Sequence, residues 1–151
     1  MIPSTITPID PAINRFILQQ TSATICCVGE QGKPWCFSCF YAYDPGEGLL
    51  YFKSSAHTAH AIMLRKDPRV AGTILPDRIN KLLVKGIQLE GVVLAPEDPL
   101  LGRAWGTYHK KYPLALGISG ELWAIQISHI KMTDSTLGFG TKIRWSRKAD
   151  Q

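Results

Sequence analysis

Residues 53–60, with the sequence KSSAHTAH, bring together the side chains of this chain that are best suited to bind an anion. Lys53 precedes Ser54 and Ser55, and Thr58 and His60 follow within one helical turn. Ammonium, hydroxyl and imidazole groups donate hydrogen bonds, and the start of a helix adds unpaired backbone N–H groups and a positive dipole end. This stretch therefore predicts a phosphate site. The alternative is an ordinary capped helix whose hydroxyl groups satisfy only their own backbone.

The flanking segments place these residues where a strand passes into a helix. Residues 49–52, LLYF, are apolar and aromatic, as in a strand, and Ser54 or Ser55 is expected to cap the helix that follows. An Asp-Pro pair at 67–68 ends this helix. One helical face is predicted to carry Ala59, Ile62, Met63 and Lys66.

The rest of the pattern predicts one mainly β domain that covers residues 1–151. Apolar, β-branched or alternating runs predict strands at residues 23–29, 35–44, 49–52, 69–75, 81–95, 121–132 and 142–145. Helices are expected at residues 8–20, 55–66 and 97–112. Because most strands follow one another without a crossover, the pattern favours an antiparallel split β-barrel of about seven strands with three peripheral helices.

The composition is that of a soluble globular protein, with 45% hydrophobic and 19% charged residues. No run of about 18 apolar residues and no export signal is visible, so we expect a cytoplasmic protein without a membrane segment. The net charge of +5 is compatible with an anionic ligand. A nucleic-acid-binding barrel is the alternative, since Trp35 and Tyr43 could stack on bases, but the basic residues do not interleave with the aromatic ones.

Four cysteines lie in the first third of the chain, and two of them form the motif Cys36-x-x-Cys39. Such spacing can bind zinc or support redox chemistry. The surrounding aromatic residues predict a strand, in which residues three apart point to opposite faces. We therefore expect no metal site here and interpret the cysteines as small buried hydrophobic residues.

Asp44 and the sequences of residues 50–55, 58–60 and 67–71, in this order of elements, resemble the FMN-binding split-barrel superfamily. Pyridoxamine 5′-phosphate oxidase is the familiar enzyme of that superfamily. Residues 133–140, TDSTLGFG, resemble more closely its YhbP-like branch. The resemblance implies a homodimer that holds FMN at the subunit interface, with the phosphate at the start of the helix after the third strand.

Transferred position by position, the resemblance implies that Thr58 takes the place of the phosphate-binding serine or threonine. His60 stands where the oxidases have a basic residue, Gln88 faces the flavin ring, and Ser38 contacts the ring edge through its backbone. The full set of implied cofactor-binding residues is Ser38, Lys53, Ser54, Ser55, Thr58, His60 and Gln88.

The sequence departs from the oxidases in two places. The arginine and lysine of their second strand are replaced within residues 36–41, and their C-terminal arginine-histidine motif is not recognisable. Pyridoxamine phosphate is therefore not the expected substrate. We expect a flavin-dependent oxidoreductase in which the substrate and any catalytic residue stay open. The alternative is a non-enzymatic barrel that binds haem, another phosphorylated cofactor or a protein partner; His57 and His60 could also ligate a metal or haem.

Overall fold

Eight strands pair into one antiparallel sheet in the computed structural model, which describes residues 6–148. The sheet order is β2-β1-β5-β6-β7-β4-β3, and β8 pairs with β7 outside this path. The strands are β1 (Ser22–Val28), β2 (Pro34–Phe40), β3 (Ala42–Asp44), β4 (Leu49–Ser54), β5 (Arg69–Ile74), β6 (Lys85–Val93), β7 (Glu121–Asp134) and β8 (Lys142–Ser146).

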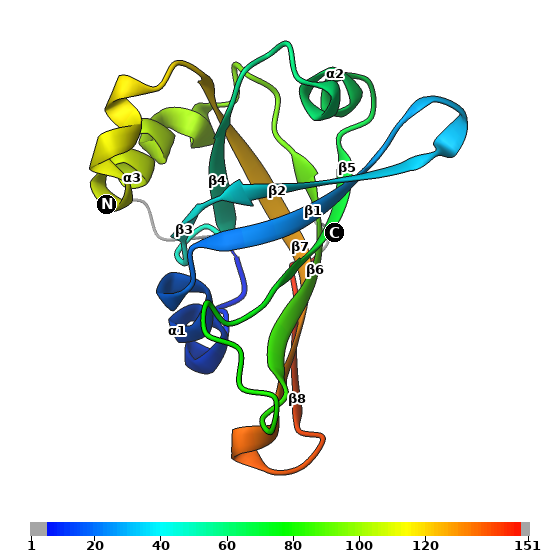
Figure 1. The fold of residues 1–151 in the computed structure, drawn as a ribbon, viewed down its shortest axis with the longest axis vertical. Helices are drawn as coiled ribbons and strands as arrows, with labels where there is room; N and C mark the ends of the chain where they lie inside the picture. The colour runs from blue at the N-terminus through cyan, green and yellow to red at the C-terminus, as the bar shows by residue number, and fades with distance from the viewer. Residues whose placement is uncertain (1–5, 149–151) are drawn as a thin grey trace.

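The sheet curls until β2 approaches β4 (Figure 1). Side chains connect these two strands, and the rings of Phe37 and Phe52 lie 5.7 Å apart. The predicted antiparallel split barrel is thereby confirmed. The predicted strand 35–44 is divided at Tyr41, whose N–H donates to the Thr21 carbonyl and whose hydroxyl donates to the Ile17 carbonyl.

Side chains that point inward and outward alternate along the strands, as the two-residue period of a strand requires. The pattern is most regular in β5 and β6, where every second residue is buried. The inward residues form one core with the apolar face of the first helix, α1 (Pro11–Gln19). Phe52, Trp123 and Ile125 are among its fully enclosed members.

Two further helices, α2 (Ala59–Lys66) and α3 (Ala104–Lys111), pack on the barrel, with α2 following β4 (Figure 1). The short 3-10 helices are η1 (Glu30–Gly32), η2 (Pro99–Arg103), η3 (Pro113–Gly117) and η4 (Ser135–Leu137). The helix predicted at 97–112 is therefore two segments, η2 and α3. Among residues 6–148, no helix has the length and apolar character needed to cross a membrane.

Strand β6 begins at Lys85 rather than at residue 81, because a turn in which Leu82 N–H bonds to the Asn80 side chain occupies the preceding residues. The register between β6 and β7 shifts between Glu90 and Gly91. A Cβ atom at Gly91 would lie 2.5 Å from the Gln126 carbonyl oxygen. The close approach of the two backbones therefore requires glycine.

Replacing Gly91 with alanine should lower the free energy of unfolding by about 2–4 kcal/mol, because the backbones of two paired strands must move apart. Urea unfolding followed by circular dichroism measures this change. Gly106→Ala is the control: apart from the adjoining backbone of its own helix, nothing lies within 4 Å of the added methyl group, and alanine favours the helix. Equal stability of Gly91→Ala and the wild type would contradict the contact.

Candidate functional site

Strand β4 ends at Ser54, and helix α2 begins at Ala59, after a connection of four residues. The N-cap of α2 is Thr58, whose Oγ1 accepts a hydrogen bond of 3.2 Å from Ala61 N–H. The prediction that Ser54 or Ser55 caps the helix was wrong. Ser55 instead stabilises the turn before the helix, where its Oγ accepts from His57 N–H at 3.2 Å.

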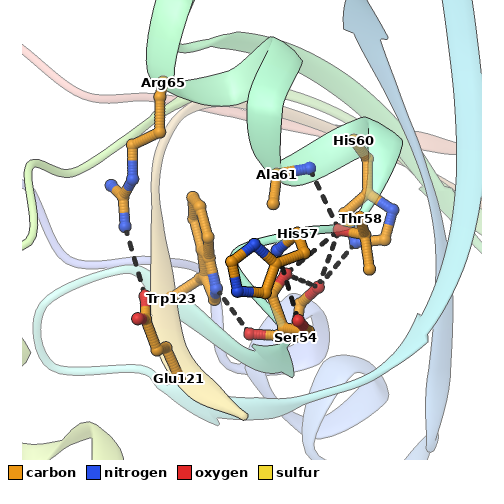
Figure 2. Close-up of polar contacts among 9 residues, drawn as sticks. Ser54, His57, Thr58, His60, Ala61, Arg65, Glu121 and Trp123 are labelled. Atoms are coloured by element: carbon orange, nitrogen blue, oxygen red, sulfur yellow. Dashed lines mark hydrogen bonds and ion pairs between the residues drawn. The ribbon is translucent and has the colours of Figure 1, made fainter.

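Four of the predicted site residues lie together at the helix start, and we call Ser54, Ser55, Thr58 and His60 the helix-start cluster. Figure 2 labels Ser54, Thr58 and His60 of this cluster. Ser54 Oγ lies 2.8 Å from His60 Nε2 and 3.2 Å from Thr58 Oγ1. Both hydroxyl groups also donate to the Ser55 carbonyl at 3.1 Å. The hydroxyl protons of the cluster thus converge on one carbonyl oxygen.

The cluster also contains donors without a partner. Among the described residues, no hydrogen-bond acceptor is found for the backbone N–H groups of Ala59 and His60. Ser55 is exposed, and Ser54, Thr58 and His60 are partly exposed. Two N–H groups at the positive end of a helix dipole, beside two hydroxyl groups that water can reach, form an arrangement that binds anions.

His60 is held by a ring contact as well as by its hydrogen bond. Its imidazole stacks on Phe37 of β2, with ring centroids 3.9 Å apart and an angle of 10° between the planes. Burial lowers the pKa of His60 below its ordinary value of 6.5. The imidazole is therefore mainly neutral at pH 7, and it contributes a hydrogen bond rather than a full positive charge.

Residues that the sequence did not single out fix the position of α2. Trp123 of β7 donates from Nε1 to the Ser54 carbonyl at 3.1 Å. The Arg65 guanidinium lies over the Trp123 ring at 3.8 Å and faces Glu121 at 3.9 Å (Figure 2). A sequence pattern shows no such contact, because it depends on the pairing of β4 with β7.

Lys53 points away from the helix-start cluster. Its Nζ donates to the Ala115 carbonyl at 2.8 Å and contacts His109 Nε2 at 3.0 Å. Since His109 Nδ1 lies 2.9 Å from the Trp105 carbonyl, Nδ1 carries the ring proton and Nε2 accepts from Lys53. The structure therefore does not bring Lys53 to the helix-start cluster: adjacent strand residues face opposite sides, and Lys53 joins β4 to α3 and η3.

The buried residues of α2 are Ala61 and Leu64. On the predicted helix face, Met63 is only partly buried against the core and Ile62 is exposed. Ala59, Ile62, Met63 and Lys66 instead line a groove of about 670 Å³ between α2 and the β1–β2 hairpin. Its volume is in the range of small-molecule sites. Trp35 and Pro34 of β2 contribute to the opposite wall. The groove therefore begins beside Ala59, one of the two residues with an unpaired N–H.

Ser38 and Gln88 lie elsewhere, exposed on the outward face of the sheet. They belong to a row of polar side chains that are cross-strand neighbours, which we call the polar row: Ser38, Thr24, Thr73, Gln88, Lys131 and Arg144. A hollow of about 420 Å³ lies over its central part. Among the described residues, no hydrogen bond, ion pair or ring contact joins Ser38 or Gln88 to the helix-start cluster.

Lys131 and Arg144 were not predicted, although both line this hollow. The alternation of residues 121–132 was visible in the sequence, but the register that aligns Lys131 with Gln88 on one side and Arg144 on the other was not. Lys131 and Arg144 are the two positively charged members of the polar row.

Only two of the four cysteines pack in or against the core, although all four were expected to be buried. Cys27 is buried and Cys39 packs against the core, but Cys36 is exposed and Cys26 is partly exposed. Cys36 and Cys39 point to opposite faces, as predicted for a strand. Among the described residues, no group of three or more histidine, cysteine, aspartate or glutamate side chains is placed to hold a metal ion.

Comparison with known proteins gives the family. Residues 9–132 match the family model described as pyridoxamine 5′-phosphate oxidase. The chain belongs to this family. A UPF0306 protein of Serratia proteamaculans is 36% identical over 137 residues, which cover 89% of this chain and 93% of that protein. This relative confirms the predicted resemblance to the YhbP-like branch.

Solved structures with low sequence identity share the fold. A heme binding protein from Mycobacterium smegmatis superposes with a TM-score of 0.73 at 18% identity and covers 87% of this chain. The chain corresponds to 55% of that protein's length. A FAD-binding protein from Mesorhizobium loti has a TM-score of 0.62 at 14% identity, with 83% of this chain and 95% of that protein covered. The fold of this family thus occurs in proteins that bind flavin and in proteins that bind haem.

Acidification should destabilise the protein partly through His60. Its pKa in the folded state is below 6.5, so the unfolded state binds more protons as the pH falls through this value, and the free energy of unfolding decreases. His60→Gln should therefore reduce the loss of stability between about pH 7.5 and pH 5 in urea titrations. His57→Gln, which changes an exposed histidine three residues earlier, is the matched control. Equal flattening in both variants would contradict the role of His60 burial.

Proposed function

We propose that this protein binds FMN, with the phosphate at the helix-start cluster, and acts as a flavin-dependent oxidoreductase. The observation that carries the proposal is the pair of unpaired N–H groups of Ala59 and His60 beside the hydroxyl groups of Ser54 and Thr58. Membership of the pyridoxamine 5′-phosphate oxidase family supports it. The class of substrate is left open.

The described residues fit a phosphate by hydrogen bonding more than by charge. The hydroxyl groups of Ser54 and Thr58 would turn from the Ser55 carbonyl to the phosphate oxygens, and the two backbone N–H groups would gain their first partner. Neutral His60 would add one ring N–H. With Lys53 engaged at α3, the site lacks the lysine that the sequence had placed there, so moderate affinity is expected.

When bound, the flavin supplies the electron-transfer chemistry, and the protein supplies binding and orientation. The helix-start cluster would hold the phosphate end. The groove between α2 and the β1–β2 hairpin offers apolar walls beside that end, including Met63 and Trp35. None of these side chains is assigned a proton transfer.

A homodimer with the flavin at the subunit interface is part of the proposal. Ser38 and Gln88 lie on the outward face of the sheet, so a partner subunit could present its polar row to the flavin held at the helix start. A cluster of apolar side chains on α3 and the segment after it is more than half exposed, namely Trp105, Leu114, Leu116 and Ile118. Exposed apolar clusters of this kind are typical of interfaces, and we propose that a second copy of the chain covers this one.

Thr58→Asp should weaken FMN binding at least about tenfold, because a carboxylate within a few ångströms of a phosphate repels it by about 1–4 kcal/mol. Aspartate is as good an N-cap as threonine, so α2 should stay intact. Ser54→Ala should weaken binding by about 1 kcal/mol through one lost hydrogen bond. Quenching of flavin fluorescence on titration with protein measures both.

Riboflavin, which lacks the phosphate, is the ligand control: its affinity should be weak and the same for wild type and Thr58→Asp. The exposed Ser119 provides a matched protein control, since Ser119→Ala should bind FMN as the wild type does. Unchanged FMN affinity in Thr58→Asp would overturn the phosphate site. An absorption spectrum of haem rather than flavin in purified protein would favour the non-enzymatic alternative.

Size-exclusion chromatography with light scattering should give twice the 16.7 kDa mass of one chain. Leu114→Glu places a charge in the proposed interface at a side chain that is 93% exposed, so it should yield a folded monomer. Leu82→Glu is the matched control, because Leu82 is 91% exposed in a different loop. A wild-type monomer, or a Leu114→Glu dimer, would contradict the proposed interface.

A further inference from the structure

Two cysteines face each other across the β1–β2 hairpin, outside the core. Cys26 and Cys36 are direct cross-strand partners, and their Sγ atoms lie 2.8 Å apart. Cys36 is exposed and Cys26 is partly exposed, and Cys26 lines the hollow over the polar row. In a single subunit, a solvent-borne oxidant can therefore reach the pair.

The ladder between β1 and β2 shows which type of pair they form. Gly29 N–H donates to the Lys33 carbonyl, and Tyr41 N–H donates to the Thr21 carbonyl. Gly29–Lys33 and Thr21–Tyr41 are therefore hydrogen-bonded pairs. Such pairs alternate with non-hydrogen-bonded pairs along an antiparallel ladder. The Cys26–Cys36 pair lies an odd number of positions along the ladder from both of them, so it is a non-hydrogen-bonded pair. Opposite Cα atoms at such pairs are about 4.5 Å apart, within the range that a disulfide spans.

The other two cysteines have no such partner. Cys27 lies opposite Trp35, and Cys39 lies opposite Ala23. Both side chains face the interior, and burial raises the pKa of Cys39 to about 12. These thiols are therefore shielded and remain protonated, whereas Cys26 and Cys36 share one face and one level of the hairpin.

We propose that Cys26 and Cys36 are a redox-active pair that closes reversibly to an intramolecular disulfide in response to small-molecule disulfides. The exposed Cys36 thiolate attacks the disulfide RSSR, which forms a mixed disulfide and releases one RSH. Cys26 then attacks Cys36 Sγ and releases the second RSH. The protein loses two protons and two electrons, which together equal two hydrogen atoms, and RSSR is reduced to two RSH.

The contact between the two thiols also explains the order of attack. A hydrogen bond with Cys36, followed by burial, raises the pKa of Cys26 to about 11, so Cys26 stays protonated as long as Cys36 carries no RS group. Once Cys36 carries the RS group, its hydrogen bond with Cys26 is lost. Cys26 can then act as the resolving thiol that attacks the mixed disulfide. This inference does not rest on flavin binding.

The experiment uses the full chain, reduced and then incubated with excess oxidised glutathione at about pH 8. Titration of the thiols after unfolding should show that two of the four are lost, with a mass decrease of two hydrogen atoms and no glutathione adduct. Non-reducing peptide mapping should join the Cys26 and Cys36 peptides, and dithiothreitol should restore four thiols.

Single variants separate the two roles. Cys26→Ser should accumulate a mixed disulfide of Cys36 with glutathione, because the resolving thiol is gone, and Cys36→Ser should form no intramolecular bond. The matched control Cys39→Ser should still form the Cys26–Cys36 bond. Four thiols remaining in the treated wild type, or a stable glutathione adduct on it, would overturn the proposal.

Discussion

The alternation of side chains between the two faces of a closed antiparallel sheet decides what each candidate residue can do. Ser54 turns toward the start of α2, whereas its neighbour Lys53 turns toward α3. The same alternation sends Cys27 into the core and leaves Cys26 outside. Because the core fills one face almost completely, a one-residue change of register would bury polar groups without partners, so these orientations are strongly fixed.

This constraint explains how much could be predicted from the sequence. The passage from strand to helix near Ser54 was predictable, since a run of apolar residues ends there in small hydroxyl residues. The antiparallel barrel followed from strands that succeed one another without crossovers. The division of residues 35–44 could not be foreseen, because it depends on tertiary hydrogen bonds of Tyr41 to Thr21 and Ile17.

The site was predictable as a location but not as a set of contacts. Residue types indicate a cluster of donors, yet Lys53 was misplaced because its partners, Ala115 and His109, are more than fifty residues away in the chain. Lys131 reaches the row of Gln88 only through the register of β6 with β7. Pairing between strands that are distant in sequence, rather than local propensity, decides both positions.

Thr58 carries two tasks at the helix start, and its hydrogen bonds show that they are compatible. Its oxygen lone pair accepts from Ala61 N–H and thereby caps α2, whereas its proton is directed to the Ser55 carbonyl. An anion would take the proton and leave the lone pair in place, so binding need not unravel the helix. The backbone of Ser54 is also fixed, because Trp123 Nε1 donates to its carbonyl, and an anion could replace the Ser55 carbonyl as the acceptor of its hydroxyl proton. A cluster built like this keeps its backbone fixed while its protons change partner, which is what a site that binds and releases a phosphate requires.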